Sequence, residues 1–200
     1  MSEKRQLIVG LTGMSGAGKS TVCRVFRDSG FEVIDCDKCA REVAEPGMPA
    51  LYELRDRLSG GLIRQDGSLD RQKTAEMIFT DPEKRALFNK IIYPYITYNI
   101  TVKLRQAGEY VLLDAPTLFE ARLELLCGAI VSVTASADNC IRRITARDGI
   151  TTELAAARLK SQHGAEFYRE RSDFCLVNDG TQEELFAQAS VIAEKLKGIT

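Results

Sequence analysis

The chain has 200 residues, of which 44% are apolar and 28% are charged. That length is enough for one domain with a hydrophobic core and a modest insertion. Lysine and arginine total 27 while aspartate and glutamate total 28, so no excess of charge favours a nucleic acid or an anionic membrane as the partner. No apolar run approaches the length of a membrane span, and the polar residues 1–6 do not resemble a signal peptide.

The six cysteines are scattered through apolar segments, as is typical of free buried thiols. This pattern predicts a reducing, cytoplasmic environment. Cys36 and Cys39 form a Cys-x-x-Cys pair, which raises the alternative of a redox or zinc site. Three features count against that alternative: the chain has no second cysteine pair, its one histidine, His163, is distant in sequence, and Cys36 lies between two aspartates, which disfavour a thiolate.

The predicted elements alternate between strands and helices. Apolar runs of strand length cover 7–12, 31–35, 111–114, 129–134 and 174–177. Most of these runs are continuous, as in parallel strands that are buried on both faces. Helical patterns cover 19–29, which Gly30 should stop, as well as 137–147 and 182–197. The alternation predicts an α/β fold, a doubly wound three-layer arrangement with a five-stranded parallel sheet.

The first predicted strand leads into a phosphate-binding P-loop. Residues 13–20 read Gly13-Met14-Ser15-Gly16-Ala17-Gly18-Lys19-Ser20, which is the G-x-x-x-x-G-K-S pattern. The glycines let successive backbone N–H groups point at one spot. Lys19 brings a positive charge to the β- and γ-phosphates, Ser20 offers a hydroxyl to Mg²⁺, and the following helix places its positive dipole end on the same phosphates.

Two aspartates follow the second predicted strand. In an extended chain residues two apart point to the same side, so Asp35 and Asp37 should project together at the ligand crevice. One carboxylate could accept the proton of an attacking hydroxyl while the other orients Mg²⁺ through water. The structural alternative is that either one only caps the next helix.

About 75 residues without a clear strand separate the second and third predicted strands. We expect a helical insertion at 46–106 beside the nucleotide core. Pro46-Gly47 interrupts the pattern first, and Asp66-Gly67-Ser68 marks a turn. Asp70 is a predicted N-cap, and Asp81-Pro82 an N-cap with proline at the first helical position. Pro94 should kink or break the long helical pattern that follows.

Further candidate residues lie in the second half of the chain. Asp114 ends the third predicted strand, where an acid suits Mg²⁺ binding through water. Arg143 and Arg147 are four residues apart on one helix face and could grip phosphate oxygens. The polar interval 148–172 contains several arginines and is either a solvated helical region or a mobile lid that brings arginines over the phosphates.

These residues together resemble the dephospho-CoA kinase family over nearly the whole chain. The Asp-x-Asp-x-x-Ala-Arg run, with an Asp-Pro-Glu segment at this distance, is much more specific than the P-loop. The residues that carry the resemblance are Leu11-Thr12-Gly13 with the P-loop, Val33-Ile34-Asp35-Cys36-Asp37, Ala40-Arg41-Glu42-Val43, Glu45-Pro46-Gly47, Leu69-Asp70-Arg71, Ile78-Phe79-x-Asp81-Pro82-Glu83, Asn89-Lys90-Ile91-Ile92-Tyr93-Pro94, Asp114-Ala115-Pro116-Thr117-Leu118-Phe119-Glu120, Arg143, Arg147-Asp148 and Asn178-Asp179-Gly180.

The resemblance implies ATP-dependent phosphorylation of the ribose 3′-hydroxyl of dephospho-CoA, the last step of CoA synthesis, with Mg²⁺ accompanying ATP. It implies a three-layer P-loop kinase core that binds the nucleotide, at 1–45 and 107–200, a helical substrate domain inserted at 46–106 and a lid at 148–172. The expected partners are the small molecules ATP and dephospho-CoA, with no nucleic acid and no membrane, in a monomer or weak oligomer.

Residue by residue, the match implies that Asp37 is the general base, Arg143 a lid arginine and Arg41 a substrate contact. With the P-loop pattern, the expected catalytic residues are Lys19, Asp37 and Arg143. The expected ATP-binding residues are Gly13, Ser15, Gly16, Ala17, Gly18, Lys19, Ser20, Thr21, Arg143, Arg147, Asn178 and Gly180. The expected substrate-binding residues are Thr12, Asp37, Arg41, Phe79, Asn89, Tyr93 and Leu118, and the expected metal-binding residues are Ser20, Asp35 and Asp114.

The chain departs from the family pattern at a few positions. Tyr93 stands where the family usually has histidine, so a role that needs an imidazole does not carry over. Thr117 stands where leucine is usual and could alter the substrate wall. Met14 and Ala17 replace commoner P-loop residues without removing a phosphate-binding N–H.

The sequence is also compatible with two alternative functions. A nucleoside or nucleotide kinase would share the core and differ in its acceptor. A GTP-switch module would need a guanine-reading Asn-Lys-x-Asp motif, and the nearest match, at Asn89-Lys90-Ile91-Ile92, lacks the acid.

Overall fold

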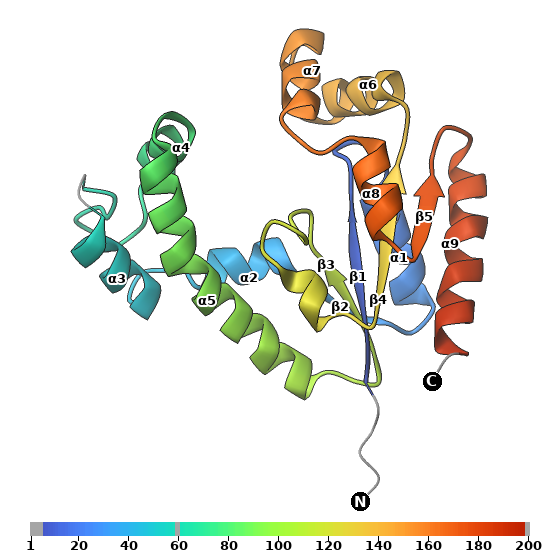
Figure 1. Ribbon diagram of the computed structural model, residues 1–200, viewed down its shortest axis with the longest axis horizontal. Helices are drawn as coiled ribbons and strands as arrows, with labels where there is room; N and C mark the ends of the chain where they lie inside the picture. The colour runs from blue at the N-terminus through green and yellow to red at the C-terminus, as the bar shows by residue number, and fades with distance from the viewer. Residues whose placement is uncertain (1–5, 59–60, 199–200) are drawn as a thin grey trace, which may run out of the picture. The chain divides into compact units, whose positions relative to one another are not determined.

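The computed structural model describes residues 6–58 and 61–198, apart from the side chain of Phe79 (Figure 1). Its sheet has five strands in the order β2-β3-β1-β4-β5. The strands are β1 (Leu7–Gly13), β2 (Glu32–Asp35), β3 (Tyr110–Asp114), β4 (Ala129–Thr134) and β5 (Phe174–Val177). The pairs β1–β3, β1–β4 and β4–β5 are parallel. The five predicted strands are therefore confirmed, each to within one residue at either end.

The central strands are buried because helices cover both of their faces. Val9 pairs with Leu112 on one side and with Ala129 on the other, and Val9 and Leu112 have no exposed surface. Leu11 and Val131 are equally buried. This is the reason that the strands read as continuous apolar runs rather than as alternating ones.

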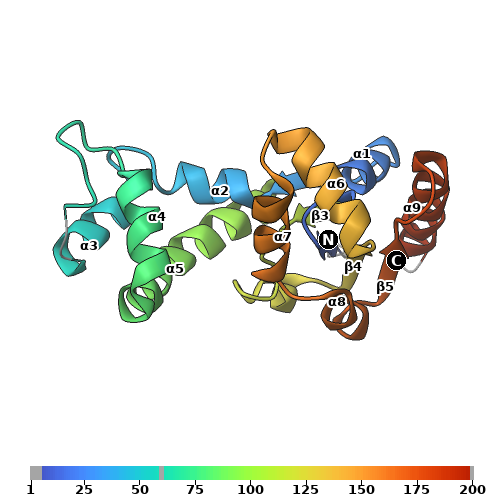
Figure 2. The ribbon, with the colours of Figure 1, turned by 90° about the horizontal axis from the view of Figure 1, so that it is seen from above.

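The sheet-containing unit also contains helices, some of which cover the two faces of its sheet (Figure 2). Its helices are α1 (Lys19–Asp28), α6 (Ala137–Asp148), α7 (Thr152–Lys160), α8 (Ala165–Arg171) and α9 (Gln182–Lys197), with a 3-10 turn at Leu123–Leu126. Helices α1 and α9 pack against each other, whereas α8 contacts β1, β4 and β5. Figure 2 shows α8 on the opposite side of these strands from α1 and α9. The predicted three-layer core is confirmed.

The chain divides into two compact units. One contains the described residues up to Ile34 together with those from Ala107 onward, and the other runs from Asp35 to Gln106. The sequence predicted the first boundary between residues 45 and 46, whereas the structure places it between Ile34 and Asp35. The functions predicted for these regions, as nucleotide core, substrate domain and lid, stay predictions.

The second unit is helical. It holds α2 (Cys36–Glu42), α3 (Pro49–Arg57), α4 (Arg71–Thr80) and α5 (Pro82–Gln106), and α2, α3 and α4 each contact the long helix α5 (Figure 1). Buried residues recur every fourth position along α5, at Ile92, Ile96, Ile100 and Leu104. This spacing forms the apolar stripe on which the shorter helices pack.

Local signals set the ends of these helices as expected. Asp70 accepts a hydrogen bond from the Lys73 N–H at 3.1 Å at the start of α4. Asp81 accepts from the N–H groups of Glu83 and Lys84 at 3.1 and 3.0 Å where α5 begins at Pro82. Helix α5 continues through Pro94, so the break that proline could have made does not occur.

The polar interval 148–172 contains the helices α7 and α8. All six cysteines, each in the described part of the chain, are free thiols. Within residues 6–58 and 61–198, no helix combines the length and the apolar character that crossing a bilayer requires.

Candidate active site

The P-loop connects β1 to α1, and its backbone conformation requires glycine at two positions. Gly13 has φ +136° and Gly18 has φ +109°, conformations that side chains rarely allow. A Cβ at Gly13 would collide with the carbonyl oxygen of Val133, and one at Gly18 would lie 2.5 Å from Asn178 Nδ2. The loop therefore folds back against β4 and against the end of β5 at positions that only glycine permits.

Hydrogen bonds fix the loop from beneath. The Met14 N–H donates to the Val133 carbonyl at 3.1 Å, and Asn178 Nδ2 donates to the Ala17 carbonyl at 2.7 Å. Met14, Ala17 and Asn178 are buried. Asn178, which was expected to bind ATP, supports the loop through its side chain, and the unusual residues Met14 and Ala17 face the core.

Helix α1 begins at Lys19, directly after the loop. The N–H groups of Thr21 and Val22 donate to the Gly18 carbonyl, whereas those of Lys19 and Ser20 precede the first intrahelical bond and belong to the turn that points toward a ligand. Lys19 Nζ lies 3.6 Å from Asp114 Oδ1 at the end of β3, and both side chains are largely buried, at 19% and 25% exposure. The two predicted site residues Lys19 and Asp114 therefore form an ion pair.

The environment of Asp114 suits a cation site. Its Oδ1 is buried and has no hydrogen-bond partner among the described residues, and the Lys19 ammonium 3.6 Å away is its charged neighbour, although buried polar atoms are normally hydrogen-bonded. The described part of the chain contains no cluster of three or more His, Cys, Asp or Glu side chains that could hold a metal alone. An ion that keeps several waters and takes further ligands from substrate phosphates fits such a sparse site.

Helix α6 brings Arg143 to the loop. Its guanidinium donates to the Gly16 carbonyl at 3.4 Å. Arg147, one turn further on, instead makes a bidentate contact with Asp148 at 2.7 and 2.9 Å. The Arg147 guanidinium lowers the pKa of the Asp148 carboxyl. Arg158 on α7 also donates to Asp148, at 2.8 Å, so Asp148 links α6 to α7 and holds the arginine that was expected to bind ATP.

Sequence reasoning missed Gln162, in the connection between α7 and α8. The Ser15 N–H donates to Gln162 Oε1 at 3.0 Å, and Gln162 Nε2 donates to Ser15 Oγ at 2.8 Å. No motif pointed to this residue, because the contact joins positions 147 residues apart.

The sequence analysis also did not predict the hydrogen bonds that Asp179 accepts. It accepts from the Ser136 N–H at 2.7 Å and from Asn139 Nδ2 at 3.0 Å. Its place between Asn178 and Gly180, both expected to bind ATP, gave the only hint. Gly180 is exposed, and a Cβ there would collide with the Glu184 carboxylate.

Asp35 and Asp37 belong to the helical unit. The prediction that an extended chain points both side chains to the same side was wrong. Asp35 caps α2 by accepting the Lys38 N–H at 2.8 Å, and α2 begins at Cys36. The alternation of an extended chain therefore does not apply to Asp35 and Asp37. Asp37 is exposed in the first turn of α2, and Arg41 lies 3.7 Å from Asp35 Oδ2.

The remaining predicted substrate residues lie in different settings. Asn89 and Tyr93 are half-buried on α5, and their four-residue spacing puts them on one face. Thr12 is fully buried and donates to the Pro116 carbonyl at 3.2 Å. Leu118 is also fully buried and packs over Gly10, so it forms part of the core. The side chain of Phe79 lies outside the described residues.

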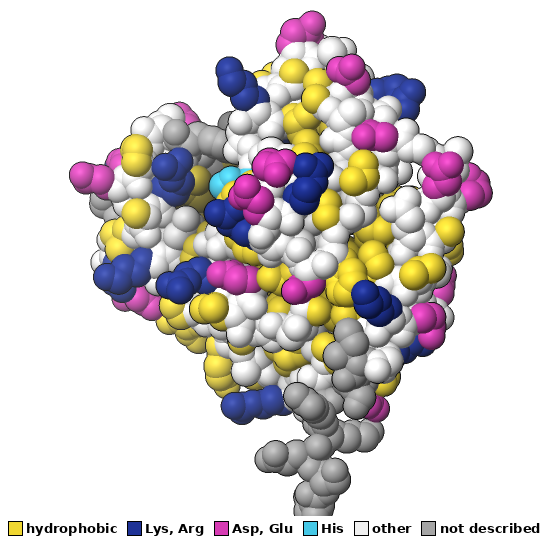
Figure 3. Space-filling model, turned by 45° about the vertical axis from the view of Figure 1, so that its right-hand side comes forward, with side chains coloured by type: hydrophobic (Ala, Val, Ile, Leu, Met, Phe, Trp, Pro, Cys, Tyr) yellow, Lys and Arg dark blue, Asp and Glu magenta, His cyan; other side chains and the backbone are white. Residues whose placement is uncertain are grey.

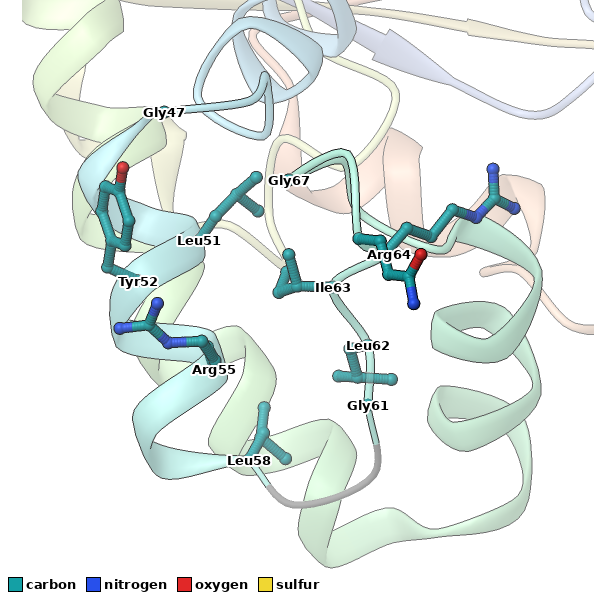
Figure 4. Close-up of a pocket in the computed structure, with 11 residues that line it drawn as sticks. Gly47, Leu51, Tyr52, Arg55, Leu58, Gly61, Leu62, Ile63, Arg64 and Gly67 are labelled. Carbon is teal, nitrogen blue, oxygen red and sulfur yellow. The ribbon is translucent and has the colours of Figure 1, made fainter.

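The described part of the helical unit contains several cavities, among them one of about 510 Å³ beside α4 and the start of α5. One of about 310 Å³ lies between α3 and the segment before α4, where Leu51, Tyr52, Arg55 and Leu62 line it (Figure 4). Another of about 760 Å³ is mostly apolar and is lined by residues of α5 that include Tyr95 and Tyr98. None of the described residues that line them is a predicted site residue.

A model of the dephospho-CoA kinase family matches residues 7–184. The chain belongs to the dephospho-CoA kinase family. It is 36% identical over 193 residues to a dephospho-CoA kinase of Thermobifida fusca, covering 96% of each chain. It is 32% identical over 194 residues to the dephospho-CoA kinase of Carboxydothermus hydrogenoformans, covering 95% of this chain and 94% of that one.

A solved structure from Thermus thermophilus is also similar. Its TM-score is 0.81 at 32% identity, and the match covers 95% of this chain and 98% of that one. Since the family match includes both the P-loop and the helical unit, it favours a kinase over the GTP-switch alternative.

Proposed function

We propose that this chain transfers the γ-phosphoryl group of ATP to the ribose 3′-hydroxyl of dephospho-CoA. The observation that carries the proposal is a formed P-loop, with Lys19 3.6 Å from Asp114, in a chain that matches the dephospho-CoA kinase family from residue 7 to residue 184. The P-loop is the basis for assigning the phosphate site, and membership of the family is the basis for assigning dephospho-CoA as the acceptor.

Positioning and electrostatics do most of the work in such a reaction. The N–H groups of the loop and of the first turn of α1 bind the phosphates. Lys19 neutralises charge as the γ-phosphoryl group is transferred. Arg143 reaches the loop from α6, where its guanidinium donates to the Gly16 carbonyl, and from there it would contact a phosphate bound in the loop.

For the acceptor we assign Asp37 as general base and Arg41 as a substrate contact. Both residues match the family motif, and both are exposed on α2. A carboxylate at this position can take the proton of the 3′-hydroxyl as the new P–O bond forms and the bond to ADP breaks. The N-cap role of Asp35 makes it the weaker candidate for the base.

Mg²⁺ is the divalent ion that we expect to accompany ATP. The Ser20 hydroxyl and the Asp114 carboxylate would hold it, directly or through water, and the buried Asp114 oxygen that lacks a hydrogen-bond partner among the described residues fits that role. When bound, the ion neutralises charge on the β- and γ-phosphates. A cytoplasmic location also remains a proposal, motivated by the free cysteines.

The direct test incubates the protein with ATP, Mg²⁺ and dephospho-CoA and identifies the product by mass spectrometry. We expect CoA with phosphate at the 3′ position and one ADP for each CoA. ADP release without a phosphorylated acceptor would contradict the proposal, and phosphate elsewhere on dephospho-CoA would contradict the assigned acceptor.

A further inference from the structure

The connection between α7 and α8 places a side-chain amide on the P-loop. Gln162 Oε1 accepts the Ser15 N–H at 3.0 Å, and Gln162 Nε2 donates to Ser15 Oγ at 2.8 Å. The amide thus contacts both the backbone and the side chain of one loop residue. An amide oxygen and a phosphate oxygen are both acceptors, so the two compete for the same backbone N–H.

The neighbours of Gln162 hold it in this place. The Gln162 N–H donates to the Leu159 carbonyl at 3.2 Å, which ties its backbone to the end of α7. His163, the single histidine of the chain and the cyan side chain in Figure 3, stacks on Phe167 of α8 with ring centroids 3.6 Å apart. His163 Nε2 also lies 3.5 Å from Glu120 Oε1. The connection is therefore anchored on both sides of Gln162.

We propose that Gln162 is a positioning residue of the nucleotide site: a latch that occupies the Ser15 N–H until a nucleotide phosphate replaces it. The proposal rests on the proposed function, in which Ser15 belongs to the phosphate-binding loop. Displacement of Gln162 by a nucleotide would break only its two hydrogen bonds to Ser15, so the state of this contact would report whether the loop is occupied.

The expected size of the effect follows from competition. A closed latch raises the apparent Kd by the reciprocal of the unlatched fraction. Net hydrogen-bond strengths in water predict that removing the latch tightens nucleotide binding by about two- to tenfold. The exposure of these contacts places the effect toward the lower part of that range.

The test measures the Kd of the Mg²⁺ complex of a non-hydrolysable ATP analogue by calorimetry for the wild type and three variants. Gln162→Ala removes the latch and should bind the analogue more tightly. Gln162→Glu keeps an acceptor for the Ser15 N–H, strengthens it by charge and repels phosphate, so it should bind more weakly. Gln188→Ala changes an exposed glutamine on α9 and should match the wild type.

A second readout separates the latch from a general structural role. Amide hydrogen exchange of Ser15 without nucleotide should be faster in Gln162→Ala than in the wild type and slower in Gln162→Glu. Equal or weaker analogue binding by Gln162→Ala overturns the latch, as does unchanged Ser15 exchange. If the wild type itself fails to bind the analogue, the nucleotide site is contradicted and the latch with it.

Discussion

Lys19 is the residue whose charge we expect to contribute most to catalysis. It is the first residue of α1, so its charge adds to the positive end of the helix dipole. Its contact with Asp114 at 3.6 Å holds a long, flexible side chain close to one place. A charge so placed acts most strongly on the phosphoryl group in the transition state.

Lys19→Met should therefore keep the fold and lose most turnover. Methionine preserves the apolar stem and removes the charge, and the loss of one such contact typically lowers kcat by about 10²–10³. Steady-state ADP release measures the effect, and Lys73→Met, at an exposed position on α4, is the control. Near-normal kcat in a folded Lys19→Met protein would contradict the P-loop assignment.

Asp37→Asn should lower kcat by about 10²–10⁴ through loss of the general base, with a much smaller change in the KM for ATP. Asp35→Asn is the matched control, because asparagine is also a good N-cap and should preserve the start of α2. The same kinetic assay serves both variants. If Asp35→Asn proves the more damaging to kcat, our assignment of the two aspartates is reversed.

At the scale of elements, the P-loop depends on the close approach of β1 to β4. Gly13→Ala forces a side chain into a left-handed conformation and against the Val133 carbonyl. Backbone strain and overpacking together predict a loss of about 2–5 kcal/mol in the free energy of unfolding. Urea unfolding measures it.

Gly30→Ala separates the two causes of that loss. Gly30 has φ +91°, yet nothing lies within 4 Å of its Cβ position. Strain alone predicts a loss of about 1–2 kcal/mol. Equal losses in the two variants would show that the contact with Val133 contributes nothing.

The end of β5 is tied to the start of α6 by Asp179, and this tie should depend on pH. Hydrogen bonds from the Ser136 N–H and Asn139 lower the pKa of the Asp179 carboxyl. The stabilisation is therefore full above the ordinary aspartate pKa, about 3.9, and disappears as the pH falls through the lowered folded value.

Unfolding of the wild type and of Asp179→Ala by urea, at pH 7 and at pH 3, tests this dependence. The variant should be less stable at pH 7, and the difference should shrink at pH 3. Asp138→Ala, at an exposed aspartate of α6, is the control. A difference that grows with acid would contradict the assigned cause.

The sequence predicted those elements whose signals are local. Continuous apolar runs identified the strands, and side-chain caps at Asp70 and Asp81 identified the starts of α4 and α5. The start of α2 was left open in the sequence, because an aspartate at the end of a strand can also cap a following helix, and the structure shows that Asp35 does both. The contacts of Gln162 with Ser15 and of Asp179 with Ser136 depend on tertiary structure and have no local signature.

At the scale of the whole molecule, the chain has one unit built on a sheet and one built on the long helix α5. The sheet unit carries the P-loop, Lys19 and Asp114. The helical unit carries the residues that we assign to the acceptor, Asp37 and Arg41. We therefore expect residues of the helical unit to determine which acceptor is phosphorylated.

Acceptor discrimination tests this account most directly. Binding energy from the pantetheine arm can be used to position the 3′-hydroxyl in line with the γ-phosphate, so an acceptor without the arm should lose kcat as well as affinity. The measurement is kcat/KM for ATP-dependent ADP release with dephospho-CoA, adenosine, AMP and CMP. We predict at least about a tenfold preference for dephospho-CoA, or roughly 1.4 kcal/mol of transition-state discrimination. A preference for AMP or CMP would contradict the account.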